Sequence, residues 1–229
     1  AGTEFSDASE AVTAQQGTAG FGALFESTYR RDTIGLCLAF FMVVLSLYSA
    51  FSWLPTMLTN EGLPVTLASQ GLTAYNLGGV IGALLCAVSI NRFGSRRPMI
   101  IACVLAAASA FAMMGLDVKG NSTALIFGFG VHGLFVNAAQ VSLYALCAYV
   151  YATHVRATGT ATALAVGRGG GILSSFIGAA VITAGGASGY LGLLATGMIG
   201  AAIALLIVRR HIPPVSERGA GAGSPLASH

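Results

Sequence analysis

Residues 34–57 read IGLCLAFFMVVLSLYSAFSWLPTM, a run of 24 residues without a charged side chain. A helix rises about 1.5 Å per residue, so a run of this length covers the roughly 30 Å apolar core of a bilayer. A helix is expected because backbone polar groups in lipid must be satisfied within the segment, and the run lacks the alternation of a barrel strand. The stretch therefore predicts a transmembrane helix.

Composition supports the same conclusion for the whole chain. Of its 229 residues, 55% are apolar and 8% are charged, and the mean hydropathy is +0.78. An ordinary soluble domain carries about 25% charged residues. The net charge of +3 is too small and too dispersed to indicate a nucleic-acid partner. We expect the lipid bilayer to be the main partner of this chain.

Five further apolar stretches are long enough to cross a membrane. Together with the first they predict an all-α integral membrane protein of six transmembrane helices, folded over residues 29–211. The flanking residues 1–28 and 212–229 are rich in small and polar residues, and we expect a flexible linker and a flexible tail. The predicted spans are residues 34–57, 72–90, 99–116, 124–151, 161–184 and 190–208.

The placement of basic residues predicts the orientation of these spans. Nine of the eleven lie on one side, Lys119 alone lies in the loops of the other side, and Arg168 lies within a span. Because Lys and Arg gather in cytoplasmic loops, both termini are predicted to be cytoplasmic in a multi-pass protein of the inner cell membrane. The nine residues are Arg30, Arg31, Arg92, Arg96, Arg97, Arg156, Arg209, Arg210 and Arg218.

Two enzyme-like motifs conflict with this topology. Gly128-Phe-Gly130-Val-His-Gly133 has dinucleotide-binding spacing, but it lies inside an apolar span and no acidic residue follows it at about 20 residues. Ser188 lies in a Gly-Ala-Ser-Gly sequence that resembles the rhomboid intramembrane proteases. The one downstream histidine before the tail, His211, is about 33 Å away at the opposite membrane face. His132 lies upstream, in the wrong order for that family, and no enzyme is expected.

No metal site, disulfide or cofactor is expected either. The cysteines are isolated within apolar runs, without the paired spacing of a zinc site or a disulfide framework. We interpret them as small buried hydrophobic residues. They are Cys37, Cys86, Cys103 and Cys147.

The junction of the second and third spans carries a motif. Asn91-Arg-Phe-Gly-Ser-Arg-Arg97 resembles the cytoplasmic loop signature of the major facilitator superfamily, in which an Asp precedes the first Arg and a Gly shapes a turn. Asn91 stands here where the signature has Asp. The resemblance implies a cytoplasmic gating motif made of Asn91, Arg92, Gly94, Arg96 and Arg97.

Further matches resemble the aromatic acid:proton symporter branch of that superfamily. They are Tyr29-Arg-Arg-Asp-Thr33 followed by Trp53-Leu-Pro-Thr56, then Asn137-Ala-Ala-Gln140 with Tyr144, Tyr151-Ala-Thr-His-Val-Arg156-Ala-Thr-Gly159 and Gly167-Arg-Gly-Gly-Gly171. Ala152 replaces the Pro that is usual there. The resemblance adds Arg156 to the gating motif.

This resemblance implies a transporter of twelve helices, of which the chain supplies helices seven to twelve. The N-terminal six-helix half, with an acidic motif implicated in proton coupling, would then be missing from this chain. The charges agree, since no predicted span contains an Asp or Glu. A carboxylate proton relay is not expected within these spans.

Arg168 is the candidate for substrate binding, as the one charged residue well inside a span. It lies seven to ten residues from the predicted cytoplasmic end, about 10 to 15 Å deep. An Arg centred in lipid costs roughly 2.5 to 3.5 kcal/mol, so such residues usually face a cavity. Its guanidinium is suited to a substrate carboxylate. A gating role near the cytoplasmic end and a purely structural role remain alternatives.

Polar residues of the fourth span are candidates for lining a cavity. Asn137, Gln140 and Tyr144 follow i, i+3, i+7 spacing and share one helix face. His132 lies on a neighbouring face, where hydrogen-bonded packing is the alternative to a titrating role. In other spans, Tyr48 and Asn76 are additional candidates.

The sequence therefore predicts half of a secondary transporter that moves a small organic anion around a midplane site. The branch resemblance implies an aromatic acid carried by proton symport. The alternative is a truncated or split helical bundle that transports nothing alone and acts as a partner or remnant.

Overall fold

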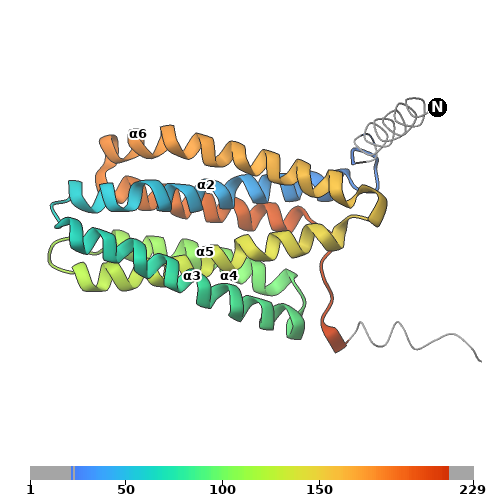
Figure 1. Cartoon of the computed structure of the whole chain (residues 1–229), viewed down its shortest axis with the longest axis horizontal. Coiled ribbons are helices and arrows are strands. Elements are labelled where there is room, and N and C mark those ends of the chain that lie inside the picture. The colour runs from blue at the N-terminus through green and yellow to red at the C-terminus, as the bar shows by residue number, and fades with distance from the viewer. Residues whose placement is uncertain (1–21, 23, 217–229) are drawn as a thin grey trace, which may run out of the picture.

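The computed structural model describes residue 22 and residues 24–216, and within them it contains helices and no strand. Each of the five long helices is apolar enough to cross a membrane, and they lie side by side as a bundle (Figure 1). The all-helical prediction is confirmed for this part of the chain. The helices are α2 (Arg30–Asn60), α3 (Val65–Phe93), α4 (Arg96–Met114), α5 (Ser122–Val150) and α6 (Thr153–Ile207).

Helix α6 changes direction at Gly186. The backbone there has φ 56° and ψ −144°, a left-handed conformation that glycine adopts without steric cost. Figure 1 shows α6 turning back at this point. We name residues 153–185 the first arm and residues 187–207 the second arm. Both arms contact α2. In the first arm, Gly167 packs against Phe40 and Gly178 packs against Trp53. In the second arm, Gly197 packs against Ser46 and Ala204 packs against Gly35.

This reversal explains the difference between prediction and structure. Six separate spans were predicted, whereas five helices are assigned, because predicted spans 161–184 and 190–208 both fall within α6. The first arm also begins earlier than expected, at Thr153. The remaining four predicted spans coincide with α2 to α5 to within four residues at their ends, except that α3 begins seven residues before the predicted span, at Val65.

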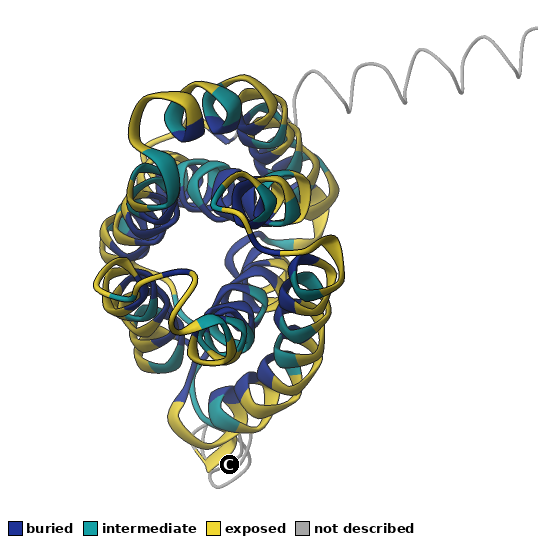
Figure 2. Cartoon of the chain, turned by 90° about the vertical axis from the view of Figure 1, so that its left-hand side faces the viewer, coloured by how far each residue is buried: buried dark blue, intermediate teal, exposed yellow. Residues whose placement is uncertain are grey.

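The connections gather at two ends of the bundle. The α2–α3 and α4–α5 connections share one end with the reversal of α6, while the α3–α4 and α5–α6 connections lie at the other (Figure 1). Seen from the first end, buried residues face inward and exposed residues face outward (Figure 2). Residues 1–21, 23 and 217–229, which include most of the predicted linker and tail, lie outside the described residues.

Glycines let the helix backbones approach closely where α3 crosses α5. A Cβ at Gly78 or Gly82 of α3 would collide with the carbonyl group of Gly130 or Leu134 on α5. Small residues have this role in membrane bundles, because apolar burial against lipid does not itself drive helix association. The α3–α5 pairing therefore depends on these glycines.

We expect Gly82→Val to lower the free energy of unfolding by about 1–3 kcal/mol or more, because the isopropyl group forces α3 away from α5. Gly192→Ala is the matched control, since no atom lies within 4 Å of a Cβ there. It should leave stability unchanged or raise it by up to about 1 kcal/mol. Unfolding in mixed detergent micelles, followed by circular dichroism, measures both. Equal stability of Gly82→Val and the unsubstituted chain would contradict the packing argument.

Candidate functional site

Three of the predicted site residues are left exposed by the other described helices. Tyr48 on α2 is 50% exposed, Tyr144 on α5 is 45% exposed, and Arg168 on the first arm is also exposed. Buried Phe40 of α2 connects them, because the Tyr144 ring packs edge-on against it at 5.3 Å and Gly167 packs against it from the first arm. We name Tyr48, Tyr144 and Arg168 the open face.

Arg168 is the unbalanced charge of the open face. It lies fifteen residues after Thr153, about 22 Å along the first arm, and eighteen residues before Gly186. It therefore lies halfway along its helix, deeper than the sequence indicated. Within the described part of the chain its guanidinium has no hydrogen-bond or ion-pair partner. Charged residues within membrane spans usually face a bundle interior or a cavity and pair with other residues or with backbone carbonyls.

Gln140 adjoins the open face through Tyr144. Its Nε2 donates a hydrogen bond to the Tyr144 hydroxyl at 3.2 Å, whereas its buried Oε1 has no partner. Asn137 instead donates to the carbonyl of Gly133 in its own helix, and its side chain fills the space beside Gly79 of α3.

Asn76 and His132 are separated from this group. Asn76 is exposed on α3 and donates to the carbonyl of Leu72 in its own helix. His132 is fully buried, with Nδ1 3.0 Å from both Ser109 Oγ and the Ala106 carbonyl of α4. The structure thus places His132 in the α4–α5 interface. Nothing in the spacing of the sequence singled out Ser109 as its neighbour.

The predicted gating motif, apart from Arg156, lies around the connection between α3 and α4, whereas Arg156 lies in the first turn of α6. Gly94 adopts φ 75°, which fits the turn, and Asn91, Arg92, Arg96 and Arg97 are exposed around it. Fully buried Ser95 was not predicted as a functional residue. It makes the contacts that hold this turn in place.

Ser95 is bound to the segment that follows α6. Its N–H donates to the Ile212 carbonyl at 2.9 Å, and the Ile212 N–H donates to Ser95 Oγ at 2.9 Å. The Ser95 hydroxyl lies 3.3 Å from His211 Nδ1, and His211 Nε2 lies 3.1 Å from the Val208 carbonyl. A neutral His211 with its proton on Nε2 satisfies all these bonds. We name Ser95, His211 and Ile212 the tail clasp.

Asp32 holds the same end of the bundle together. It is 3% exposed, and its Oδ1 accepts a 2.6 Å hydrogen bond from the backbone N–H of Arg209. Arg210 Nε lies 3.9 Å from Oδ2. Arg31 donates to the Ile207 carbonyl, which satisfies one of the last carbonyls of α6. The start of α2 and the end of α6 are thereby joined.

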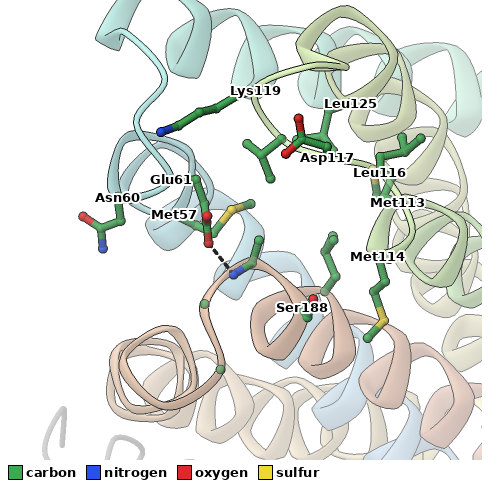
Figure 3. A pocket seen from close by; sticks show the side chains of 15 residues that line it. Met57, Asn60, Glu61, Met113, Met114, Leu116, Asp117, Lys119, Leu125 and Ser188 are labelled. Atoms are coloured by element: carbon green, nitrogen blue, oxygen red, sulfur yellow. Dashed lines mark hydrogen bonds between the residues drawn. The ribbon is translucent and has the colours of Figure 1, made fainter.

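The opposite end carries a pocket of about 530 Å³ between its connections (Figure 3). Glu61 reaches from the α2–α3 connection and accepts a 2.8 Å hydrogen bond from the N–H of Ala187, at the start of the second arm. Asp117, Lys119 and Ser188 line the same pocket, together with methionines, and no histidine does. Among the described residues no group of three His, Cys, Asp or Glu side chains is placed to hold a metal ion.

Comparison with known proteins shows which family and which proteins this chain is similar to. The model of the Major Facilitator Superfamily matches residues 36–228. A gallate transporter of Pseudomonas putida is 34% identical over 185 residues, which cover 81% of this chain and 40% of that protein. A 4-hydroxybenzoate transporter of Acinetobacter baylyi is 34% identical over 79% of this chain and 39% of its own length.

A 3-(3-hydroxy-phenyl)propionate transporter of Escherichia coli is also similar. It is 27% identical over 199 residues, which cover 85% of this chain and 49% of that protein. The chain therefore spans less than half the length of each of these three relatives.

We expect the tail clasp to weaken as the pH falls below about 6.5, the ordinary pKa of histidine. Burial lowers the pKa of His211, and nearby Arg96 lowers it further. The open clasp then binds more protons than the closed clasp, so the free energy of opening falls with pH until His211 is protonated in both states. Hydrogen exchange of the Ile212 amide against pH measures this opening.

His211→Gln should remove this pH dependence, whereas His154→Gln, an exposed histidine near the start of α6, should retain it. If the protection of the Ile212 amide from hydrogen exchange rose as the pH fell, the role assigned to His211 would be contradicted.

Proposed function

The chain belongs to the major facilitator superfamily, and on this premise we propose that it forms one half of a secondary transporter for aromatic carboxylic acids. The named relatives support this substrate class, since gallate and 4-hydroxybenzoate each carry a carboxylate on a hydroxylated ring. Because the chain spans less than half of these relatives, the proposed transporter includes a second half outside this chain. The family indicates a transporter rather than an enzyme.

The proposed topology has six crossings. The two arms of α6 pack on α2 in opposite directions, so each arm is proposed to cross the membrane once, as α2 to α5 do. The six crossings would correspond to helices seven to twelve of the superfamily. The end rich in arginine is proposed to face the cytoplasm, and the end that carries Lys119 the outside.

The uncompensated charge of Arg168 is the observation that carries the substrate proposal. Its fork of donors matches a carboxylate, which it would bind through two parallel hydrogen bonds. Tyr48 and Tyr144 present aromatic rings on the same open face, suited to packing against the ring of the substrate. Gln140 orients the Tyr144 hydroxyl.

The depth of Arg168 favours substrate contact over a gating role. A gating residue belongs near one membrane face, whereas Arg168 lies midway along the first arm. Binding sites of secondary transporters lie near the midplane, between the two halves. The open face would then be covered by the second half, and the substrate would lie between them.

Proton coupling is proposed to depend on the second half. The acidic residues of the described helices and connections are Glu26, Asp32, Glu61 and Asp117, and all of them lie at helix ends or before α2. No described carboxylate lies near Arg168. The proton would therefore be carried by a carboxylate of the other half.

The topology predicts which single cysteines react with a membrane-impermeant maleimide. In a cysteine-free background in intact cells, Lys119→Cys and Ser188→Cys should be labelled, because both line the pocket at the proposed outer end. Arg97→Cys, an exposed position at the opposite end, should be labelled only after permeabilisation. If Ser188→Cys were not labelled in intact cells, the proposal that the turn at Gly186 faces the outside would be refuted.

Arg168→Ala in the full transporter should raise the KM for a hydroxybenzoate by about 10- to 100-fold, the loss expected for hydrogen bonds to a charged group. Arg168→Lys keeps the charge but loses the fork, so its KM should be intermediate. Phe176→Leu, an exposed position two turns further on, is the matched control. Initial uptake rates in proteoliposomes measure these values, with the 229-residue chain alone as the blank.

A lower maximal rate at unchanged KM would assign Arg168 to gating instead. Unaltered uptake by both Arg168 variants would remove it from the mechanism.

A further inference from the structure

The arginine-rich end of the bundle contains a pocket of about 700 Å³ that the proposed transport site does not use. It lies between the start of α2, the α5–α6 connection and the segment that follows α6. Arg156 reaches it from the first arm, and Arg209 and Arg210 reach it from the segment after α6. We name this site the arginine pocket. It is also lined by Tyr29, Tyr149, Tyr151 and His211.

The positive charge of the arginine pocket is largely unbalanced. The guanidinium of Arg209 has no hydrogen-bond or ion-pair partner among the described residues, since its contact with Asp32 is through the backbone N–H. Arg156 bonds the Tyr151 carbonyl through Nε, which leaves its two terminal nitrogens available. Arg210 lies 3.9 Å from Asp32, a long ion pair, and over the Tyr29 ring.

The N-terminus of α6 opens into the same pocket and adds to this charge. Ala152 occupies the N-cap position and has no side chain to accept from the first N–H groups. The first turn contains no acidic residue, so nothing in it offsets the positive end of the helix dipole. Free N–H groups and forked guanidinium donors together form the usual surroundings of a bound phosphate.

We propose that the arginine pocket binds the phosphate group of an anionic phospholipid headgroup. The proposal rests on the orientation proposed above, in which this end of the bundle lies in the cytoplasmic leaflet, where anionic lipids are concentrated. A lipid is favoured over a soluble anion because the pocket lies at the helix ends, at headgroup level, beside tyrosines typical of that interface. The bound phosphate would bridge the start of α2, the start of α6 and the segment after α6.

The alternative is that these arginines only fix the topology, as basic residues at cytoplasmic ends generally do. Arg92 and Arg97 offer the comparison, because they are also exposed at the same end but do not line the pocket. A specific site predicts that the two groups differ in their effect on lipid binding. Generic surface charge predicts that they do not.

The test is native mass spectrometry of the full 229-residue chain in detergent, titrated with phosphatidic acid or phosphatidylcholine. One phosphatidic acid should be retained in preference to phosphatidylcholine. Arg209→Gln should weaken that binding by about fivefold, and Arg156→Gln with Arg209→Gln by about 25-fold. The matched control, Arg92→Gln with Arg97→Gln, should bind like the unsubstituted chain.

Two further measurements test where the bound phosphate comes from and whether the variants are folded. Inorganic phosphate or glycerol phosphate should displace the lipid only weakly, and displacement at equal affinity would show a site for soluble phosphate and overturn the lipid proposal. Arg209→Lys keeps the charge and checks that losses come from the anion contact rather than misfolding, with unchanged circular dichroism as the criterion. Equal losses in the control pair would also overturn the proposal. Neither result depends on uptake, so the transport proposal fails or stands separately.

Discussion

Lipid offers the backbone no hydrogen-bond partner, and the rest of the structure follows from this constraint. Every crossing segment must satisfy its N–H and C=O groups within itself, so the apolar runs form helices. Helices in lipid then gain stability from one another mainly by close contact and polar bonds. Gly78 and Gly82 bring α3 onto the backbone of α5, and Gly167 and Gly197 bring both arms of α6 onto α2. Backbone chemistry thus determines both the elements and their packing.

The same constraint explains the polar contacts at the two ends. Helix ends leave N–H and C=O groups unpaired, and here they are paired by side chains from other segments. Glu61 accepts from the N–H of Ala187 at one end, and Arg31 donates to the carbonyl of Ile207 at the other. The tail clasp and Asp32 add bonds between the arginine-rich connections and the segment after α6. Each end is therefore joined across helices far apart in sequence.

Sequence reasoning located the apolar helices because a hydropathy run is a local property. It misjudged the start of the first arm, because residues 153–160 are polar enough to end a hydropathy run although the helix continues through them. Arg168 consequently lies deeper than predicted. Periodicity placed His132 on a neighbouring face of α5 but could not show that α4 covers it. Ser95 and Ile212, 117 residues apart, form a contact that no local pattern encodes.

The distribution of charge differs between the ends of the bundle and its middle. The carboxylates of Asp32, Glu61 and Asp117 accept hydrogen bonds from backbone N–H groups near the helix ends. The guanidinium of Arg168, halfway along the first arm, has no partner within the described part of the chain. Hydrogen bonds across both ends oppose rearrangement within the bundle. In the proposed transporter, this bundle would therefore move as one body against the second half. The proposed site would then be completed by the substrate anion and by the facing half, which would supply what the unpaired Arg168 lacks in this bundle.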